Sequence, residues 1–123
     1  MLQHNIQDRG TLSYVEFKDL NFQPKRMYLI HGVPAGEVRG KHGHKRDKQY
    51  LVCVQGELKV RLVTKEGETF HTLKKGDSLF VDTYTWGEQT YVTGSEVMLV
   101  LCSTEFDQDD YIYDINDVIG ITR

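Results

Sequence analysis

The feature that most constrains the fold is a succession of short apolar runs separated by glycine-containing turns. The runs are rich in Val, Ile, Leu, Tyr and Phe, and none sustains a helical period of 3.6 residues. Many short strands in close succession predict an all-β sandwich or barrel. The expected strands cover residues 11–17, 25–33, 49–56, 57–64, 69–73, 78–83, 90–94 and 96–104, and the segment 104–119 could hold a short turn of helix.

Length and charge narrow the class of protein. With 123 residues the chain is expected to form one domain over 1–123, and its net charge of -3 offers no basic field for nucleic acid or membranes. No apolar run approaches the ~20 residues of a membrane-spanning helix, and the N-terminus lacks a signal-peptide pattern. A cytoplasmic location is therefore expected, with Cys53 and Cys102 as buried thiols on core strands.

Two histidines stand one residue apart in the stretch 39–49, RGKHGHKRDKQ. The first cupin motif runs from a glycine through two histidines and an acid to a second glycine. Its spacing is matched here by Gly36, His42, His44, Gln49 and Gly56. Residues i and i+2 of a strand face the same side, so both histidines project into a barrel if either does. The spacing favours a cupin jelly roll, also called a double-stranded β-helix.

The second cupin motif keeps its spacing from Gly76 onwards but loses its ligands. Asp82 and Tyr84 stand at the proline and glycine positions, and Gly87 stands at the histidine position. A cupin metal site generally takes three histidines and a carboxylate, whereas Gln49 replaces the acid here. Two imidazoles without an anionic partner make a weak site, so we expect neither a functional metal nor another cofactor.

Two histidines inside a barrel need a role other than metal binding. A buried imidazole must be hydrogen-bonded or it costs about 1–3 kcal/mol, so both could be satisfied structural residues. A same-face pair between Arg39 and Gln49 is more typical of a site in which titratable groups converge. Because histidine titrates near neutrality and moves protons without a metal, this pattern favours acid–base chemistry.

Three segments together resemble a known family. Residues 25–62, KRMYLIHGVPAGEVRGKHGHKRDKQYLVCVQGELKVRL, are similar to the WxcM-like cupins, the dTDP-4-keto-6-deoxy-D-glucose 3,4-ketoisomerases of bacterial surface-sugar pathways. The segments DRGTLSYVEF and VMLVLCSTEFDQDDYIYDINDVI resemble the same family, so the similarity covers nearly the whole chain. It implies a metal-free jelly roll, a homodimer, and isomerisation of a dTDP-4-keto-6-deoxyhexose.

The resemblance also implies roles for single residues. His42 would be the general base that moves a proton between C3 and C4 of the hexose, and His44 would assist as a proton relay or hydrogen-bonding partner. Tyr28, Arg39 and Gln49 match positions that line the family's pocket, and the first two are candidates to stabilise the enolate oxygen. Three further candidates for substrate binding are Arg26, Trp86 and Arg9, the last at a position that varies in the family.

Structural alternatives stand beside these roles. Tyr28 could be a half-buried barrel aromatic, and Arg39 could pair with a surface carboxylate. Gln49 could serve only to orient His44, and Trp86 could fill the barrel.

Two positions depart from the family pattern. Gly87 stands where relatives carry histidine or arginine, and Tyr113 stands where they carry arginine. Either change could alter the sugar accepted, the C4 configuration of the product, or activity itself.

Three other functions remain open on the sequence. A 3,5-epimerase of the same sugars also uses a jelly roll, but its base–aspartate–tyrosine pattern is not found. A non-catalytic cupin that binds a nucleotide sugar or another small ligand is made credible by the missing side chain at Gly87. A metal-dependent cupin oxygenase is disfavoured by the count of ligands.

Overall fold

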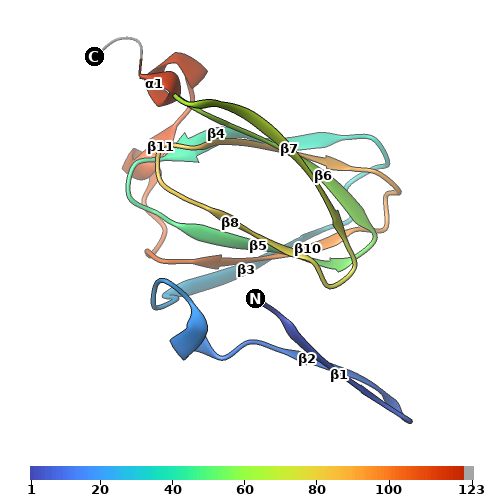
Figure 1. The fold of residues 1–123 in the computed structure, drawn as a ribbon. Coiled ribbons are helices and arrows are strands. Elements are labelled where there is room, and N and C mark those ends of the chain that lie inside the picture. Colours follow the sequence, from blue (N-terminus) through green and yellow to red (C-terminus); the bar gives the residue numbers. More distant parts are fainter. Residues whose placement is uncertain (121–123) are drawn as a thin grey trace.

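A computed structural model describes residues 1–120, in which two antiparallel sheets face each other across a common interior (Figure 1). The four-stranded sheet has the order β3 (Arg26–His31), β10 (Val97–Cys102), β5 (Gln49–Gln55) and β8 (Ser78–Val81). The five-stranded sheet has the order β11 (Tyr111–Ile112), β4 (Val38–His44), β9 (Trp86–Tyr91), β6 (Glu57–Thr64) and β7 (Gly67–Lys74). This arrangement confirms the predicted all-β jelly roll.

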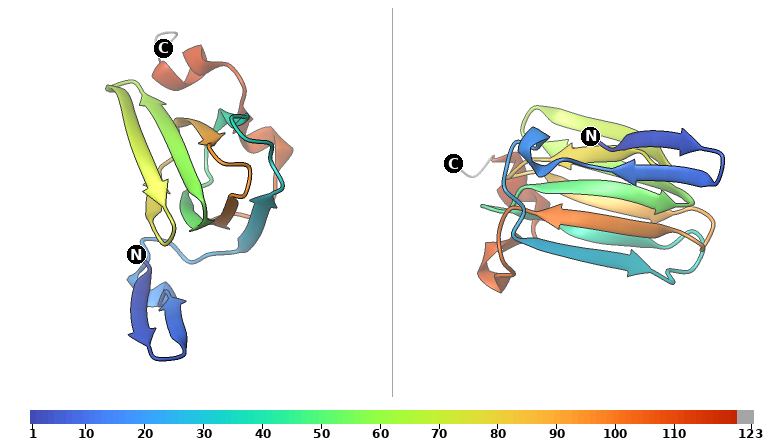
Figure 2. Two further views of the ribbon diagram at one scale, coloured as in Figure 1. Left: turned by 90° about the vertical axis from the view of Figure 1, so that its right-hand side faces the viewer. Right: turned by 90° about the horizontal axis from the view of Figure 1, so that it is seen from below.

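An N-terminal hairpin lies apart from the two sheets. Its strands β1 (Gln3–Gln7) and β2 (Gly10–Tyr14) pair with each other, and the hairpin extends beyond the outer side of the four-stranded sheet (Figure 2). All residues of both strands are exposed. The hairpin therefore contributes nothing to the interior of the barrel.

The helical elements are short. Two 3-10 turns, η1 (Phe17–Asp19) and η2 (Gln108–Asp110), flank the barrel strands, and helix α1 (Ile115–Ile119) follows β11. The Asp114 side chain caps α1 by accepting from the Asn116 N–H, and Gly120 ends it in the left-handed conformation. The expected helical turn near the end is thus confirmed, and no helix within residues 1–120 is long and apolar enough to span a membrane.

Two strand boundaries differ from the prediction by more than two residues. The strand expected over 11–17 ends at Tyr14, because the chain turns into η1, where the Asp19 N–H bonds to the Glu16 carbonyl. The strand expected over 90–94 instead begins at Trp86, in a polar stretch that pairs on both sides with neighbouring strands. Strand β1 was not predicted, because its sequence QHNIQ carries one apolar residue and no alternation.

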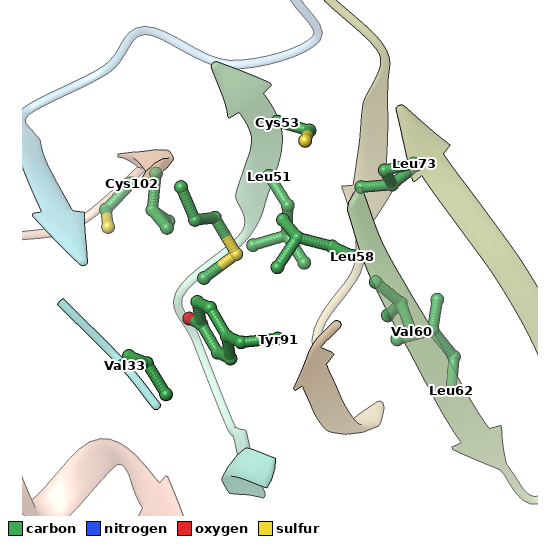
Figure 3. Close-up of a cluster of buried hydrophobic side chains, with 11 residues drawn as sticks. Val33, Leu51, Cys53, Leu58, Val60, Leu62, Leu73, Tyr91 and Cys102 are labelled. Carbon is green, nitrogen blue, oxygen red and sulfur yellow. The ribbon is translucent and has the colours of Figure 1, made fainter. Parts of the chain in front are cut away.

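Alternate residues of facing strands fill the interior. On β6, Leu58 and Val60 are buried while Lys59 between them is exposed. They pack in one cluster with residues of the opposite sheet (Figure 3), whose buried members are Val33, Leu51, Cys53, Leu58, Val60, Leu62, Leu73, Tyr91, Met98, Val100 and Cys102. Both cysteines are free and buried in this cluster, as the sequence predicts.

A buried carboxylate ties the start of β6 to the turn that precedes β10. Glu96 is 1% exposed and accepts hydrogen bonds from the N–H groups of Glu57, Thr93 and Gly94 and from the Thr93 hydroxyl. A Cβ at Gly56, where φ is +83°, would lie 2.5 Å from the Glu96 carboxylate, so this turn requires glycine. Burial would raise the pKa of Glu96, but the hydrogen bonds outweigh it and lower the pKa to about 2.

We expect Glu96→Gln to lower the free energy of unfolding at neutral pH by about 2 kcal/mol, because the amide presents donors where the carboxylate accepted. Since the folded pKa of Glu96 lies below its ordinary value of 4.5, the carboxylate's stabilisation is complete above that pH and disappears as the pH falls through about 2. Urea unfolding of both proteins across this range measures the difference, with exposed Glu105→Gln as the control. A difference that stays constant down to the lowest pH would contradict the assignment.

Candidate active site

Strand β4 carries the histidine pair and contains a bulge next to it. The strand pairs regularly with β9 up to Gly40, skips Lys41, and resumes with His42 opposite Gly87. Lys41 has a φ of 59°, and such bulges re-aim the side chains that follow them. The bulge places Arg39 and His42, which would face opposite sides of a regular strand, in the lining of the same cavity.

His42 presents one free ring nitrogen to that cavity. Its Nδ1 lies 3.0 Å from the Gly40 carbonyl oxygen, which accepts the Nδ1–H, so Nε2 of the neutral ring carries a lone pair. Burial lowers the pKa of His42, the Arg39 charge lowers it further, and the bond to Gly40 opposes both. The imidazole is therefore held in its neutral, basic form.

His44 lies behind His42 and is 6% exposed. The two rings meet edge to face with centroids 5.1 Å apart, and the Tyr111 ring lies 4.4 Å from that of His44. The Nδ1 of His44 is 3.3 Å from the Asp110 carboxylate, and its Nε2 is 3.5 Å from the side-chain nitrogen of Gln49. Burial and then the nearby His42 lower the pKa of His44, whereas Asp47 and Asp110 raise it.

Strand β3 contributes an arginine and a tyrosine from its inward face. Arg26 and Tyr28 are partly buried while Met27 between them is exposed. The Arg26 guanidinium bonds to Asp47 at 3.2 Å and lies 5.6 Å from the centre of the Tyr28 ring. Tyr28 shares a hydrogen bond with Gln49, and burial raises the pKa of its hydroxyl, which stays protonated as a donor.

These side chains surround an open cavity of about 740 Å³. Its lining consists of Arg26, Met27, Tyr28, Ile30, Arg39, Gly40, His42, Gln49, Leu51, Gln89, Met98, Phe106 and Tyr111. Within residues 1–120 no carboxylate lies within salt-bridge distance of Arg39, so its charge is available to an anionic ligand. The volume of the cavity and its mixture of cationic, aromatic and aliphatic side chains suit a ligand that combines a sugar with phosphates.

Two of the expected site residues lie elsewhere in the protomer. Trp86 is 8% exposed and packs with Ile112 and Val118 beneath α1, while its indole N–H donates to Glu88. It does not line the cavity, because Gly87 next to it faces the interior and alternation turns Trp86 outward. A contact between Trp86 and the substrate stays a prediction, to which this cavity gives no support. Arg9 lies in the turn between β1 and β2, also outside the cavity lining.

Within the part of the chain that the structure describes, no three His, Cys, Asp or Glu side chains are arranged to hold a metal ion. The carboxylate nearest to the histidine pair, Asp110, is occupied by backbone N–H groups as well as by His44. The absence of a metal in the working protein stays a prediction.

Four residues near the histidines were not predicted from the sequence. Asp47 and Asp110 are both 2% exposed, and Phe106 and Tyr111 line the mouth of the cavity. Acidic residues in the polar stretches 45–48 and 105–110 look like solvated loop residues, because no periodic pattern marks them as buried. The pairing of β11 with β4, which sets Tyr111 opposite His44, brings Asp110 and Tyr111 to the site.

Comparison with known proteins assigns the chain to a family. Residues 1–123 match the family model described as "FdtA: WxcM-like, C-terminal". The chain belongs to this family. The resemblance seen in its motifs is thereby confirmed.

Two relatives that are named for 3,4-isomerase activity on sugars resemble this chain in sequence, and one of them also in its solved fold. The TDP-4-oxo-6-deoxy-alpha-D-glucose-3,4-oxoisomerase of Aneurinibacillus thermoaerophilus is 33% identical over 111 residues, which cover 87% of this chain and 78% of the relative. The sugar 3,4-ketoisomerase QdtA of Thermoanaerobacterium thermosaccharolyticum, solved with TDP, is 32% identical, has a TM-score of 0.89, and is matched over 96% of this chain and 88% of its own.

A more distant enzyme has a similar fold. The dTDP-4-dehydrorhamnose 3,5-epimerase of Bacillus anthracis has a TM-score of 0.80 at 14% identity, with 89% of this chain and 73% of that chain covered. At this identity the likeness concerns the jelly roll alone. The epimerase alternative gains no support from it.

We expect the pKa of His42 to lie below its ordinary value of 6.5, so that the ring is neutral at pH 7. Arg39→Gln removes a nearby positive charge and should raise the pKa of His42, because protonation then meets less repulsion. An NMR titration of the ring measures both values, and Lys59→Gln, at an exposed lysine of β6, is a control with an equal change of charge. A pKa at or above 6.5 in the unchanged protein, or no response to Arg39→Gln, would contradict this electrostatic account.

Proposed function

We propose that this protein is a sugar-nucleotide 3,4-ketoisomerase that moves the keto group between C4 and C3 of a TDP-linked 4-keto-6-deoxyhexose. The observation that carries the proposal is His42, which presents an unprotonated Nε2 to a cavity lined by Arg39 and Tyr28. Support comes also from relatives that are named as 3,4-ketoisomerases and cover most of the chain. One of them, as a histidine-to-asparagine variant, was solved with TDP-4-keto-6-deoxyglucose.

The reaction needs one base, one acid and a stabilised oxygen anion. The base removes the C3 proton, which is acidic because it is α to the C4 ketone, and the electrons of the C3–H bond form the C3=C4 double bond. The C4 oxygen takes the charge and a proton, which gives an enediol. Loss of the O3 proton then forms the C3 ketone while C4 receives a proton, so atoms and electrons balance within the sugar.

The residues of the cavity divide these tasks. His42 Nε2 takes the C3 proton and returns it to C4. The protonated Tyr28 hydroxyl and the Arg39 guanidinium are the donors available for the developing oxygen anion. His44 is buried behind His42 and does not line the cavity of about 740 Å³, so its task is to support His42 or to relay its proton.

The product is a keto sugar on a nucleotide, and its C3 carbonyl is the group that an amine-transferring enzyme consumes. We place the reaction in the synthesis of deoxysugars for bacterial surface polysaccharides, as the family resemblance implies.

His42→Asn should lower kcat at least 100-fold, because general base catalysis contributes roughly 10² to 10⁴. The assay follows conversion of TDP-4-keto-6-deoxyglucose to its 3-keto isomer by NMR. His31→Asn, an exposed histidine on the outer face of β3, is the matched control and should keep full activity. Full activity in His42→Asn would overturn the base assignment, and saturable TDP-sugar binding without turnover in the unchanged protein would support the binding-cupin alternative.

We also propose that the working unit is a homodimer in which a second copy covers the apolar face near the hairpin. Ile6 is 84% exposed, Leu12 54%, and Met27 and Leu29 on the outer face of β3 are each at least half exposed. A cavity of about 900 Å³, mostly apolar, lies between the hairpin and the outer face of the four-stranded sheet. Exposed apolar surface of this extent is typical of an interface between subunits.

Replacing Ile6 by Asp should convert the dimer into a monomer, because Ile6 lines the apolar cavity and the change places a charge in the interface. Light scattering after size exclusion measures the mass. Phe70→Asp, at a 71% exposed residue on β7 outside this face, is the matched control and should stay dimeric. A monomeric unchanged protein, or a dimer that tolerates Ile6→Asp, would contradict the proposed interface.

A further inference from the structure

The buried aspartate behind the histidine pair has contacts that the reaction scheme does not yet use. Asp110 is 2% exposed, and its Oδ2 lies 3.3 Å from Nδ1 of His44. The same carboxylate accepts the N–H of Arg46 at 2.7 Å and the N–H of Asp47 at 3.1 Å. Asp110 therefore joins the loop that follows β4 to the ring of His44.

The local fold explains how an aspartate from the C-terminal part reaches this place. Asp110 closes the 3-10 turn η2, and the next residue, Tyr111, pairs with His44 where β11 joins β4. The Lys45 N–H donates to the Asp110 carbonyl, which continues this pairing. The carboxylate is thereby fixed by backbone bonds on both sides and has little freedom to leave the His44 ring.

The two ends of the His44 ring have different partners. At Nδ1 an ionised carboxylate accepts and does not donate, so Nδ1 must carry the proton. At Nε2 the nearest polar atom is the Gln49 side-chain nitrogen, a donor, which itself bonds to Asp47 at 2.9 Å. Both partners select the tautomer with hydrogen on Nδ1 and a lone pair on Nε2.

We propose that Asp110 is a positioning residue for the ketoisomerase reaction, which holds His44 in the Nδ1–H tautomer. In this form the lone pair of His44 lies on the side of Gln49, in a small cavity that His42, His44, Gln49 and Gln89 line together. His44 then offers an acceptor where His42 works, and its ring is fixed in orientation. The inference rests on the proposed function for its kinetic consequence, whereas the tautomer itself does not depend on any substrate.

The charged groups around His44 fit this role. The groups that face it are His42 on β4, Asp47 in the loop after β4, and Asp110 in η2. The Tyr111 ring packs on the His44 ring. When His42 accepts a proton, a second charge on His44 is disfavoured, and the Asp110 carboxylate lies close enough to offset the charge of the pair. A buried carboxylate on a histidine orients the ring and selects its tautomer in many enzymes.

Asp110→Asn tests the proposal, because an amide keeps the shape and one acceptor oxygen but presents N–H groups to Nδ1. We expect the two ring nitrogens of His44 to exchange their ¹⁵N NMR signatures and kcat to fall roughly 10- to 100-fold. The KM and the affinity for TDP should change by less than about twofold, because Asp110 does not line the large cavity. Asp109→Asn in the same 3-10 turn removes an equal charge from an exposed residue and should leave tautomer and kcat unchanged.

The unchanged protein supplies a second test that does not depend on the variant's folding. Its neutral His44 should show the Nδ1–H signature, and an Nε2–H signature would overturn the proposal even if Asp110→Asn is insoluble. A folded Asp110→Asn variant with unaltered kcat, or with an unaltered His44 tautomer, would also overturn it. Failure of the proposed function is separately visible, since the unchanged protein and Asp109→Asn would then both lack ketoisomerase activity.

Discussion

Two buried carboxylates, Asp47 and Asp110, hold the polar side of the barrel together. Asp110 accepts from His44 and two backbone N–H groups, while Asp47 accepts from Arg26, Gln49, the Ser103 hydroxyl and the Thr104 N–H. A buried charge without such partners would be strongly destabilising. These bonds join the loop after β4 to the segment between β10 and β11, and the histidine pair packs beside them.

A missing side chain leaves space next to the histidine pair, on the neighbouring strand of the same sheet. Gly87 lies across from His42 on β9, and a Cβ there would lie 3.5 Å from the Gln89 side chain and 3.6 Å from Leu62. These are ordinary contacts, so packing around the Cβ position does not require glycine here. The glycine leaves open space beside the proposed base, in the small cavity that His42, His44 and Gln89 also line.

The sequence predicts the repeating parts of this structure better than the irregular ones. Alternation in the strand runs predicts the two sheets and the inward pair His42 and His44, because a period of two is a property of neighbouring residues. The bulge at Lys41 and the burial of Asp110 depend on contacts between distant segments, which no local pattern contains. The burial of Trp86 beneath α1 depends on such contacts too, since its partners Ile112 and Val118 come from the C-terminal part.

The central claim is that His42 moves a proton from C3 to C4 of the keto sugar. Incubation of the protein with TDP-4-keto-6-deoxyglucose in deuterium oxide, followed by NMR of the product, tests it most directly. The account predicts a 3-keto product whose C4 hydrogen is partly or wholly deuterium, and no label at C5. Deuterium at C5 would indicate epimerisation, and a sugar recovered without isomerisation or exchange would contradict the catalytic assignment.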